Sequence, residues 1–288
     1  MKTVSAYLSL TKPRISVLFA FTGIVGLAVE ASLSASTIQY WAIILGIFFV
    51  GGAANALNQY FERDLDAKMA RTASKRALPL GKIYPRDALT FSLIMALSGI
   101  LLLVLFGNFL AGFIGLGLIL FYSLFYTLYL KPRTPQNIVI GGVAGALAPV
   151  IAWVAVTGRI DWTPLLMFAI IFFWSPPHFW ALALYYKDDY AKVGLPMLPV
   201  VAGDSVTRRH IFVYSLTLLP LSLSLYFLGT LGWLYALSAL VLSVGFVVGA
   251  FLIYRKASLQ FCRQFFAYSI FYIAFLFIAM LVDSSFFS

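Results

Sequence analysis

The sequence predicts an all-α protein that spans a membrane nine times. Of its 288 residues, 62% are hydrophobic and only 10% are charged, whereas an ordinary soluble domain is about half apolar. The apolar residues gather in nine runs, each close to the length of about 20 residues that a helix needs to cross a bilayer. Membrane barrels are built from short alternating segments instead. A bundle of membrane-spanning helices is therefore the expected fold.

The limits of the runs are set by length and by interruption with charged residues, because lipid-facing and core-facing sides are both apolar. The first run follows TKPR and lacks a cleavage pattern, so we expect a retained helix rather than a signal peptide. The second and sixth runs end in acidic stretches, the fourth ends before a lysine, and charged residues separate the eighth from the ninth. In order, the expected helices cover residues 14–32, 39–61, 88–106, 109–130, 137–157, 163–186, 211–229, 232–254 and 265–283.

No linker divides the chain, so residues 1–288 are expected to form a single integral-membrane domain. The connections on one predicted side are short. The other side carries two long loops, residues 62–87 and 187–210, and His210 is expected at the surface of the second loop. The offset of four helices between these loops suggests two parallel repeats of a helix bundle.

The basic residues lie almost entirely on one predicted side. With nine helices, every one of the 20 Lys and Arg residues except Arg159 falls on the side of the amino terminus. By the positive-inside rule this side is cytoplasmic, which places the amino terminus and both long loops in the cytoplasm. The net charge of +10 thus indicates topology and attraction to the lipid bilayer, not nucleic acid. We expect a multi-pass protein of the cell inner (plasma) membrane.

Charged residues concentrate in the stretch NQYFERDLDAKMARTASKR, residues 58–76. If the second helix continues to Asp66, then Asn58, Glu62 and Asp66 are four residues apart and share one face, with Asp64 turned away. Oxygen ligands at this spacing suit Mg²⁺ shared with a substrate phosphate. The alternative is a set of salt bridges with Arg63 and Lys68 at a solvated helix end.

A second acidic stretch, YYKDDYAKVGLPMLP at residues 185–199, follows the sixth helix on the same predicted side. Asp188 and Asp189 would join the first acids around Mg²⁺ and a diphosphate, with basic residues neutralising the remaining phosphate charge. The basic residues that could bind the phosphate groups are Arg71, Lys75, Arg76, Lys131, Arg133, Lys187 and Lys192. Nucleotide hydrolysis and acyl transfer lack their motifs, and the single Cys262 excludes an intramolecular disulfide and a cysteine metal cluster.

The sixth predicted helix carries WSPPHFWALALYY, residues 174–186. Pro176 and Pro177 are expected to kink it, and His178 would lie within the membrane, where ionisable residues are candidates for function. A regular helix places His178 and Asp189 within about 20° of one face. His178 is therefore either a heme-iron ligand or substrate contact, or a histidine hydrogen-bonded between helices.

Several motifs together resemble the UbiA superfamily of intramembrane prenyltransferases, whose members carry one acidic motif after helix two and another after helix six. The resemblance covers nearly the whole chain, and within the superfamily it is greatest to the branch that farnesylates protoheme. The motifs are TKPR at 11–14, NQYFERDLDAKMART at 58–72, KPRTPQNIVIGGVAGA at 131–146, SPPHFWALA at 175–183 and KDDYAKVGLPMLPVV at 187–201.

The resemblance implies a UbiA-type bundle and Mg²⁺-dependent transfer of a farnesyl group from farnesyl diphosphate to a vinyl group of protoheme IX, giving heme O and diphosphate. Protoheme IX (heme b) is then a substrate rather than a cofactor, and the product is expected to pass to a terminal oxidase or a heme A synthase. The implied catalytic residues are Asn58, Glu62, Asp66, Asp188 and Asp189, with Glu62, Asp66 and Asp189 as metal ligands. The expected substrate-binding residues are Arg71, Arg76, Lys131, Arg133, Lys187 and His178.

Two departures from the superfamily pattern concern the acids. Glu62 stands where many members have Asp, and Lys192 occupies the fourth place after Asp188, where other branches have a second Asp. Two other functions stay open. One is prenylation of an aromatic acid for quinone synthesis, and the other is a cation-coupled transporter, although its sites would lie nearer the midplane.

Overall fold

The computed structural model describes residues 2–287, except for the side chains of residues 2, 3, 71 and 287. Within this part of the chain, nine helices are long and apolar enough to cross a membrane, which confirms the predicted number. They are α2 (Pro13–Glu30), α3 (Ile38–Phe61), α6 (Pro85–Phe106), α7 (Phe109–Leu120) with the π-helix η1 (Phe121–Leu130), α8 (Asn137–Ala146) with α9 (Ala148–Thr157), α10 (Trp162–Tyr185), α13 (Gly203–Phe227), α14 (Trp233–Lys256) and α15 (Leu259–Phe287).

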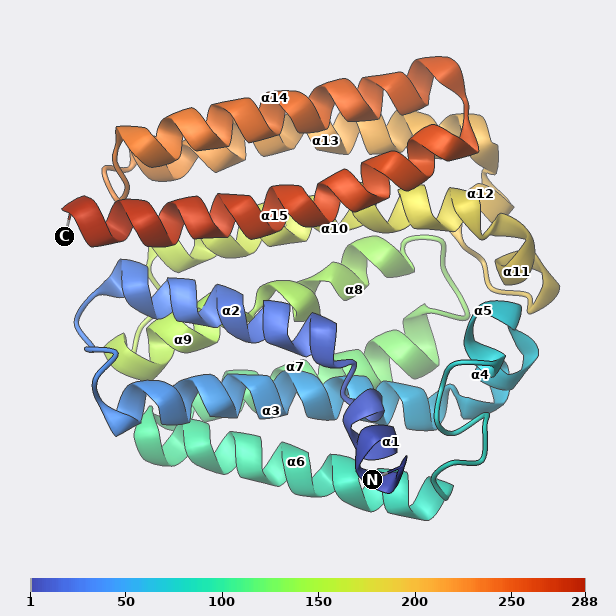
Figure 1. The fold of residues 1–288 in the computed structure, drawn as a ribbon, viewed down its shortest axis with the longest axis horizontal. Coiled ribbons are helices and arrows are strands. Elements are labelled where there is room, and N and C mark those ends of the chain that lie inside the picture. Colours follow the sequence, from blue (N-terminus) through green and yellow to red (C-terminus); the bar gives the residue numbers. More distant parts are fainter. Residues whose placement is uncertain (1, 288) are drawn as a thin grey trace.

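The long helices run side by side along the longest axis of the molecule (Figure 1). The short helices that follow α3 and α10 gather at one end, opposite the carboxyl terminus (Figure 1). They are α4 (Arg63–Lys68), α5 (Ala70–Ala73), α11 (Lys187–Lys192) and α12 (Leu198–Val201), while α1 (Lys2–Leu10) precedes the bundle. One end of the bundle is therefore built from polar segments that the sequence brings in after its second and sixth spans.

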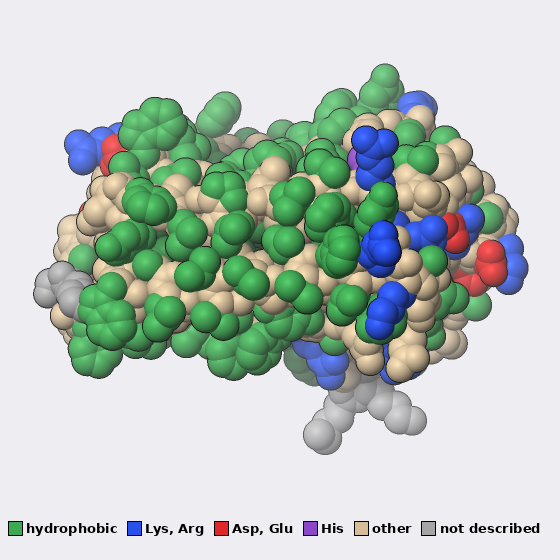
Figure 2. Space-filling model, turned by 90° about the horizontal axis from the view of Figure 1, so that it is seen from above, with side chains coloured by type: hydrophobic (Ala, Val, Ile, Leu, Met, Phe, Trp, Pro, Cys, Tyr) green, Lys and Arg blue, Asp and Glu red, His purple; other side chains and the backbone are tan. Residues whose placement is uncertain are grey.

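The surface agrees with a membrane-embedded bundle. Figure 2 shows hydrophobic side chains covering the middle of the molecule, whereas Lys and Arg side chains gather at the end that carries the short helices. This is the distribution expected from the one-sided placement of the basic residues.

Local sequence signals explain where several spans begin and end. Pro13 starts α2, where the missing N–H of proline costs nothing. The side chain of Thr37 accepts a hydrogen bond from the backbone N–H of Tyr40 and caps α3, and Asn108 caps α7 in the same way. Gly158 adopts the left-handed conformation that ends α9. Ordinary helix capping thus explains where these helices begin and end.

The amino-terminal end of α14 is capped by a residue from a distant helix. Asp283 of α15 is fully buried, and its carboxylate accepts hydrogen bonds from the backbone N–H groups of Gly232, at 2.5 Å, and Tyr235, at 2.8 Å. A carboxylate at this position satisfies two free donors and interacts favourably with the helix dipole. The last two spans are therefore locked together at this end.

The second long loop is shorter than predicted. Helix α13 begins at Gly203, so His210 lies in a helix and not in a loop; its Nδ1 is 2.8 Å from the backbone oxygen of Val206, one turn earlier. The helix extends beyond the apolar run because its backbone hydrogen bonds stay satisfied while polar side chains reach the membrane surface. Helix α10 is not interrupted by its two prolines: it continues through Pro176 and Pro177 as far as Tyr185.

Candidate active site

The predicted stripe of acids forms although the helix is interrupted. Helix α3 ends at Phe61, and α4 begins at Arg63, but the backbone hydrogen bonds continue from Glu62 to Asn58 at 3.0 Å and from Asp66 to Glu62 at 2.8 Å. The residues therefore stay on one face. Asn58, Glu62 and Asp66 are 2%, 4% and 2% exposed, whereas the side chain of Asp64 is 84% exposed.

Three cations from different parts of the chain surround these acids. Lys131 forms an ion pair with Glu62, and Arg76 forms one with Asp66 while its Nη1 lies 3.5 Å from a Glu62 oxygen. Lys12 donates a hydrogen bond of 3.1 Å to Oδ1 of Asn58. We call Lys12, Asn58, Glu62, Asp66, Arg76 and Lys131 the charged cluster. Its buried acids pair with distant cations, so the alternative of local salt bridges with Arg63 and Lys68 does not describe them.

The environment of the cluster shifts its acids in opposite directions. Burial opposes the charge on Glu62, but Lys131, Lys12 and Arg76 outweigh it and lower the pKa of this carboxyl group. At Asp66, burial outweighs Arg76 and raises the pKa. Glu62 is therefore the more firmly ionised of the two.

The environment of the cluster also perturbs the pKa of Lys12. Burial, reinforced by Arg76, lowers its pKa to about 7. The cluster holds three basic and two acidic side chains, so it carries an excess positive charge when Lys12 is protonated. Such a site favours an anion, and an anion in turn favours the protonated lysine.

The π-helix η1 positions the last part of the cluster. The backbone N–H of Lys131 donates to the oxygen of Tyr126, five residues earlier, which places Lys131 at the end of η1. Thr127 accepts a hydrogen bond of 3.0 Å from Nδ2 of Asn58 and donates one of 2.7 Å to the backbone oxygen of Tyr122. π-Helical segments are frequent at functional sites. This one ties the fourth span to the acids of the second.

Lys12 and Thr127 are not among the predicted site residues. Lys12 lies in the TKPR motif, which carried the family resemblance, but its approach to Asn58 depends on a left-handed backbone conformation with φ of 49°. Thr127 sits in an apolar run, where one hydroxyl group gives no signal.

The predicted substrate-binding cations separate into two groups. Arg76 and Lys131 belong to the cluster, as described above. Arg133 is exposed and donates to the backbone oxygens of Leu128 and Tyr129, and Lys187 pairs with Asp204 at 2.7 Å. The side chain of Arg71 lies outside the described part of the structure.

The second acidic motif is oriented differently from the first. Asp188 is exposed and lines a pocket of about 350 Å³ that also contains Lys187, Asp204, Arg208 and Cys262. Asp189 is half-buried, and its neighbour Tyr190 is buried. Among the described residues, no three Asp, Glu, His or Cys side chains are close enough to share one metal ion. The joint action of the two motifs stays a prediction.

His178 is buried at the contact between α10 and α15. Its Nδ1 lies 2.6 Å from Oγ of Ser269, and its ring is stacked between Trp174, at 4.5 Å, and Phe266, at 4.4 Å. Trp174 also donates to the backbone oxygen of Ser269. This geometry is that of a histidine hydrogen-bonded between helices, one of the two interpretations of the sequence.

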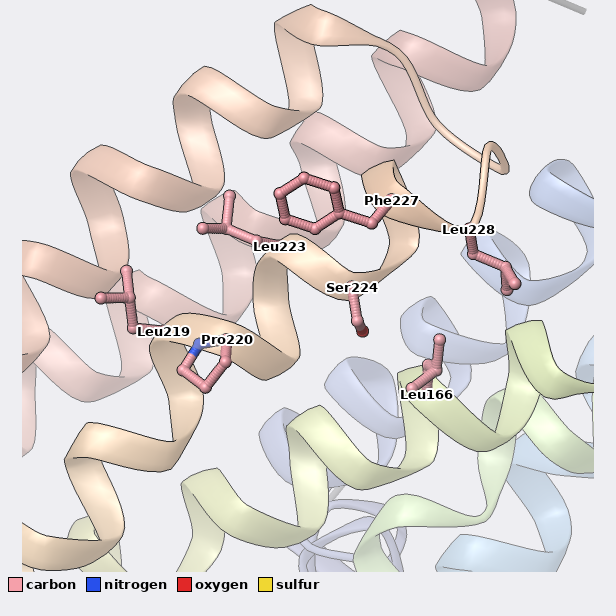
Figure 3. Close-up of a pocket in the computed structure, with 7 residues that line it drawn as sticks. All are labelled: Leu166, Leu219, Pro220, Leu223, Ser224, Phe227 and Leu228. Atoms are coloured by element: carbon pink, nitrogen blue, oxygen red, sulfur yellow. The ribbon is translucent and has the colours of Figure 1, made fainter.

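A groove of about 610 Å³ lies elsewhere on the bundle, between α10 and α13 (Figure 3). Figure 3 shows Ser224 among apolar residues such as Leu166, Leu223 and Phe227. The hydroxyl of Ser224 already donates to the backbone oxygen of Leu221. The groove therefore offers little for chemistry, unlike the charged cluster.

The donor set of the cluster fits Mg²⁺ only together with an anion. The oxygens of Asn58, Glu62 and Asp66 are ligands that Mg²⁺ prefers. Each carboxylate is also paired with a cation, and three cations would oppose a bare divalent ion. A diphosphate carries more negative charge than one Mg²⁺ neutralises. Diphosphate and Mg²⁺ bound together therefore carry a net negative charge, which matches the excess positive charge of the cluster.

The nine apolar spans of the described residues and their buried cluster of acids and cations suit an intramembrane prenyltransferase. The chain belongs to the UbiA prenyltransferase family, whose model matches residues 18–280. A protein named protoheme IX farnesyltransferase from Gloeobacter violaceus is 44% identical and aligns over 97% of this chain and 92% of its own length. A protein of the same name from Granulibacter bethesdensis is 43% identical and aligns over 98% of this chain and 92% of its own length.

Solved structures confirm the fold. A structure of digeranylgeranylglyceryl phosphate synthase has a TM-score of 0.81, is 20% identical and is covered over 99% of both chains. A UbiA homolog from Archaeoglobus fulgidus bound to GPP and Mg²⁺ has a TM-score of 0.60 and is 17% identical, with 96% of this chain and 99% of that chain covered.

Proposed function

We propose that the protein transfers a farnesyl group from farnesyl diphosphate to a vinyl group of protoheme IX, with heme O and diphosphate as products. The observation that carries this proposal is the buried charged cluster, in which three basic side chains meet two acidic ones next to the apolar spans. Relatives that are 43% and 44% identical over nearly the full length bear the name of this activity.

The cluster would hold the diphosphate end of the substrate. Lys12, Arg76 and Lys131 converge on one buried region and would donate to phosphate oxygens. Asn58, Glu62 and Asp66 would hold Mg²⁺. That a UbiA homolog from Archaeoglobus fulgidus is bound to GPP and Mg²⁺ supports a metal-bound diphosphate in this fold. When bound there, Mg²⁺ supplies Lewis-acid stabilisation of the charge on the leaving diphosphate.

The cations of the chain also serve the chemical step. The allylic C–O bond breaks with its electron pair going to the diphosphate, and Lys131 and Arg76 stabilise the growing negative charge. The vinyl electrons of heme then form the new bond to the farnesyl cation. Water then adds to the resulting heme-side cation and loses a proton to solvent, which gives the hydroxyethylfarnesyl group.

The bundle excludes water until the vinyl group attacks. The farnesyl chain would extend from the cluster toward the apolar middle of the membrane, where the helices are hydrophobic. Asp189 is the member of the second motif better suited to help, because it is half-buried whereas Asp188 is exposed. The amino terminus and both polar segments would face the cytoplasm at the inner membrane, and heme O would pass to a terminal oxidase or a heme A synthase.

The test uses purified protein in lipid nanodiscs with farnesyl diphosphate, protoheme IX and Mg²⁺. We expect heme O by mass spectrometry and one diphosphate released per product. Asp66→Asn and Glu62→Gln should lower the rate at least about 100-fold, the scale of losing a group that binds transition-state charge. Asp64→Asn, at an exposed neighbouring position, is the matched control and should keep the wild-type rate.

Two results would overturn the proposal. One is a normal rate of heme O formation in the Asp66→Asn and Glu62→Gln variants. The other is prenylation of 4-hydroxybenzoate without any heme product, which would show the aromatic-acid branch of the family. A cation-coupled transporter is disfavoured because α4, which carries Asp66, lies at one end of the bundle (Figure 1) and because the family consists of prenyltransferases.

A further inference from the structure

Two tyrosines lie directly on the membrane side of the charged cluster. Tyr126 and Tyr122 are on η1, one and two helical turns before Lys131, and their rings stack at 5.1 Å with an angle of 14° between the planes. Glu62 lies close enough to interact electrostatically with both side chains. The pair therefore borders the point where the polar end of the site meets the apolar interior.

The position of the pair is fixed by the same contacts that build the cluster. The backbone oxygen of Tyr126 accepts from the N–H of Lys131 at 2.8 Å, and the backbone oxygen of Tyr122 accepts from the hydroxyl of Thr127 at 2.7 Å. Thr127 in turn binds Asn58. The tyrosines and the groups proposed to hold diphosphate thus belong to one connected unit.

A glycine on the neighbouring helix makes room for one of the rings. A methyl group at Gly141 of α8 would lie 2.5 Å from ring carbons Cδ2 and Cε2 of Tyr126, far inside van der Waals contact. One turn further along α8, a methyl group at Gly145 would meet nothing within 4 Å. Close packing against Gly141 therefore restricts where the Tyr126 ring can lie.

We infer that the stacked pair of Tyr122 and Tyr126 stabilises the farnesyl cation through the faces of its rings. The inference rests on the proposed function. If the diphosphate is held by Lys131 and its neighbours while the prenyl chain points into the membrane, the first carbons of the chain pass beside these residues. An aromatic face attracts a cation, and the attraction is strongest where water is excluded.

The step that the pair assists is the ionisation already described. The C1–O bond breaks, its electrons leave with diphosphate, and positive charge spreads over the allylic carbons of the farnesyl group. That charge is removed when the vinyl electron pair of heme forms the new carbon–carbon bond. An interaction that exists only while the charge exists raises kcat and leaves ground-state binding of farnesyl diphosphate unchanged.

The first test replaces the rings singly. Tyr126→Leu and Tyr122→Leu should each lower kcat about 10- to 30-fold with a KM for farnesyl diphosphate within about threefold of wild type. Tyr126→Phe keeps the aromatic face and should restore most of kcat. The matched control is Tyr129→Leu, since Tyr129 is exposed on the same helix and stacks on Phe125 instead.

The second test separates electronic from structural roles. Phenylalanine analogues with one, two and three ring fluorines at position 126 weaken the negative face of the ring with little change of shape. We expect kcat to fall stepwise along the series at constant KM. Gly141→Ala should also lower kcat by displacing the ring, whereas Gly145→Ala should not.

A flat fluorine series, or a Tyr126→Leu variant with wild-type kcat, overturns the inference while wild-type protein still makes heme O. Wild-type protein that makes no heme O overturns the proposed function instead. If Tyr126→Leu does not fold, the fluorine series still decides, because each analogue is close in size to the native ring.

Discussion

Lys12 allows the binding site to be tested by pH. Burial, with Arg76, lowers its pKa to about 7, and a bound diphosphate would return that pKa toward the ordinary value of about 10.4. Above pH 7, binding must therefore take up a proton. The affinity for farnesyl diphosphate is expected to fall as the pH rises, because a growing share of Lys12 has lost the proton that binding requires.

The size of the effect follows from the pKa. About half of Lys12 is protonated at pH 7 and about 1% at pH 9, so one linked proton raises the Kd of farnesyl diphosphate about 50-fold between these values. Below about pH 6 the effect of Lys12 levels off. The substrate contributes little above pH 7, because a terminal phosphate with a second pKa near 6 is already ionised. Glu62, whose pKa is lowered, stays ionised over the same interval.

The measurement is the Kd of farnesyl diphosphate by isothermal titration calorimetry from pH 6 to pH 9, at constant Mg²⁺ and ionic strength. Titrations in buffers of different ionisation enthalpy report the number of protons taken up. Lys12→Arg is the matched control, because a guanidinium stays charged throughout and should give a much flatter profile. A wild-type Kd that changes less than threefold between pH 7 and pH 9, or an equal slope in Lys12→Arg, would refute the reasoning.

Three further outcomes are expected. Lys131→Met should weaken binding of farnesyl diphosphate about 10- to 100-fold by removing a charge-assisted contact, whereas Arg133→Met at an exposed position should stay within about twofold in the same calorimetric assay. Asp283→Ala removes two hydrogen bonds at the start of α14 and should lower the free energy of unfolding by about 2–3 kcal/mol. In a fluorescence melt the Tm should fall by about 5–10 °C. An unchanged Tm, or an equal fall of the Tm in the control variant Ser285→Ala, would contradict this. Chelation of divalent ions by EDTA should abolish heme O formation, and excess Mg²⁺ should restore it; product formed at the normal rate in EDTA would argue against a metal.

The sequence is sufficient to predict the number of spans and the acidic stripe, for a simple reason. Spans are recognised by length and hydropathy, which do not depend on how helices pack. The alignment of Asn58, Glu62 and Asp66 depends only on the helix period, and it survives the interruption at Glu62 because the backbone hydrogen bonds continue through it.

The rest of the site depends on packing and could not be predicted in this way. Lys12 reaches Asn58 through a left-handed residue before α2, and Thr127 is directed by a π-helix; neither has a periodic signal. The direction of Asp188 depends on how α11 turns after α10. The partner of His178, Ser269 of α15, likewise depends on packing, and a substrate contact of this histidine stays a prediction.

The ion pairs of the charged cluster have a consequence for the cost of substrate capture. Desolvating a lone charge is expensive, but in this protein every buried carboxylate of the cluster already neutralises a cation. When the substrate arrives, Lys131 and Arg76 need only exchange a carboxylate partner for a phosphate partner. The acids thus act as internal counter-ions of Lys131 and Arg76 between turnovers, so these two cations are paired in the low-dielectric site before the substrate binds.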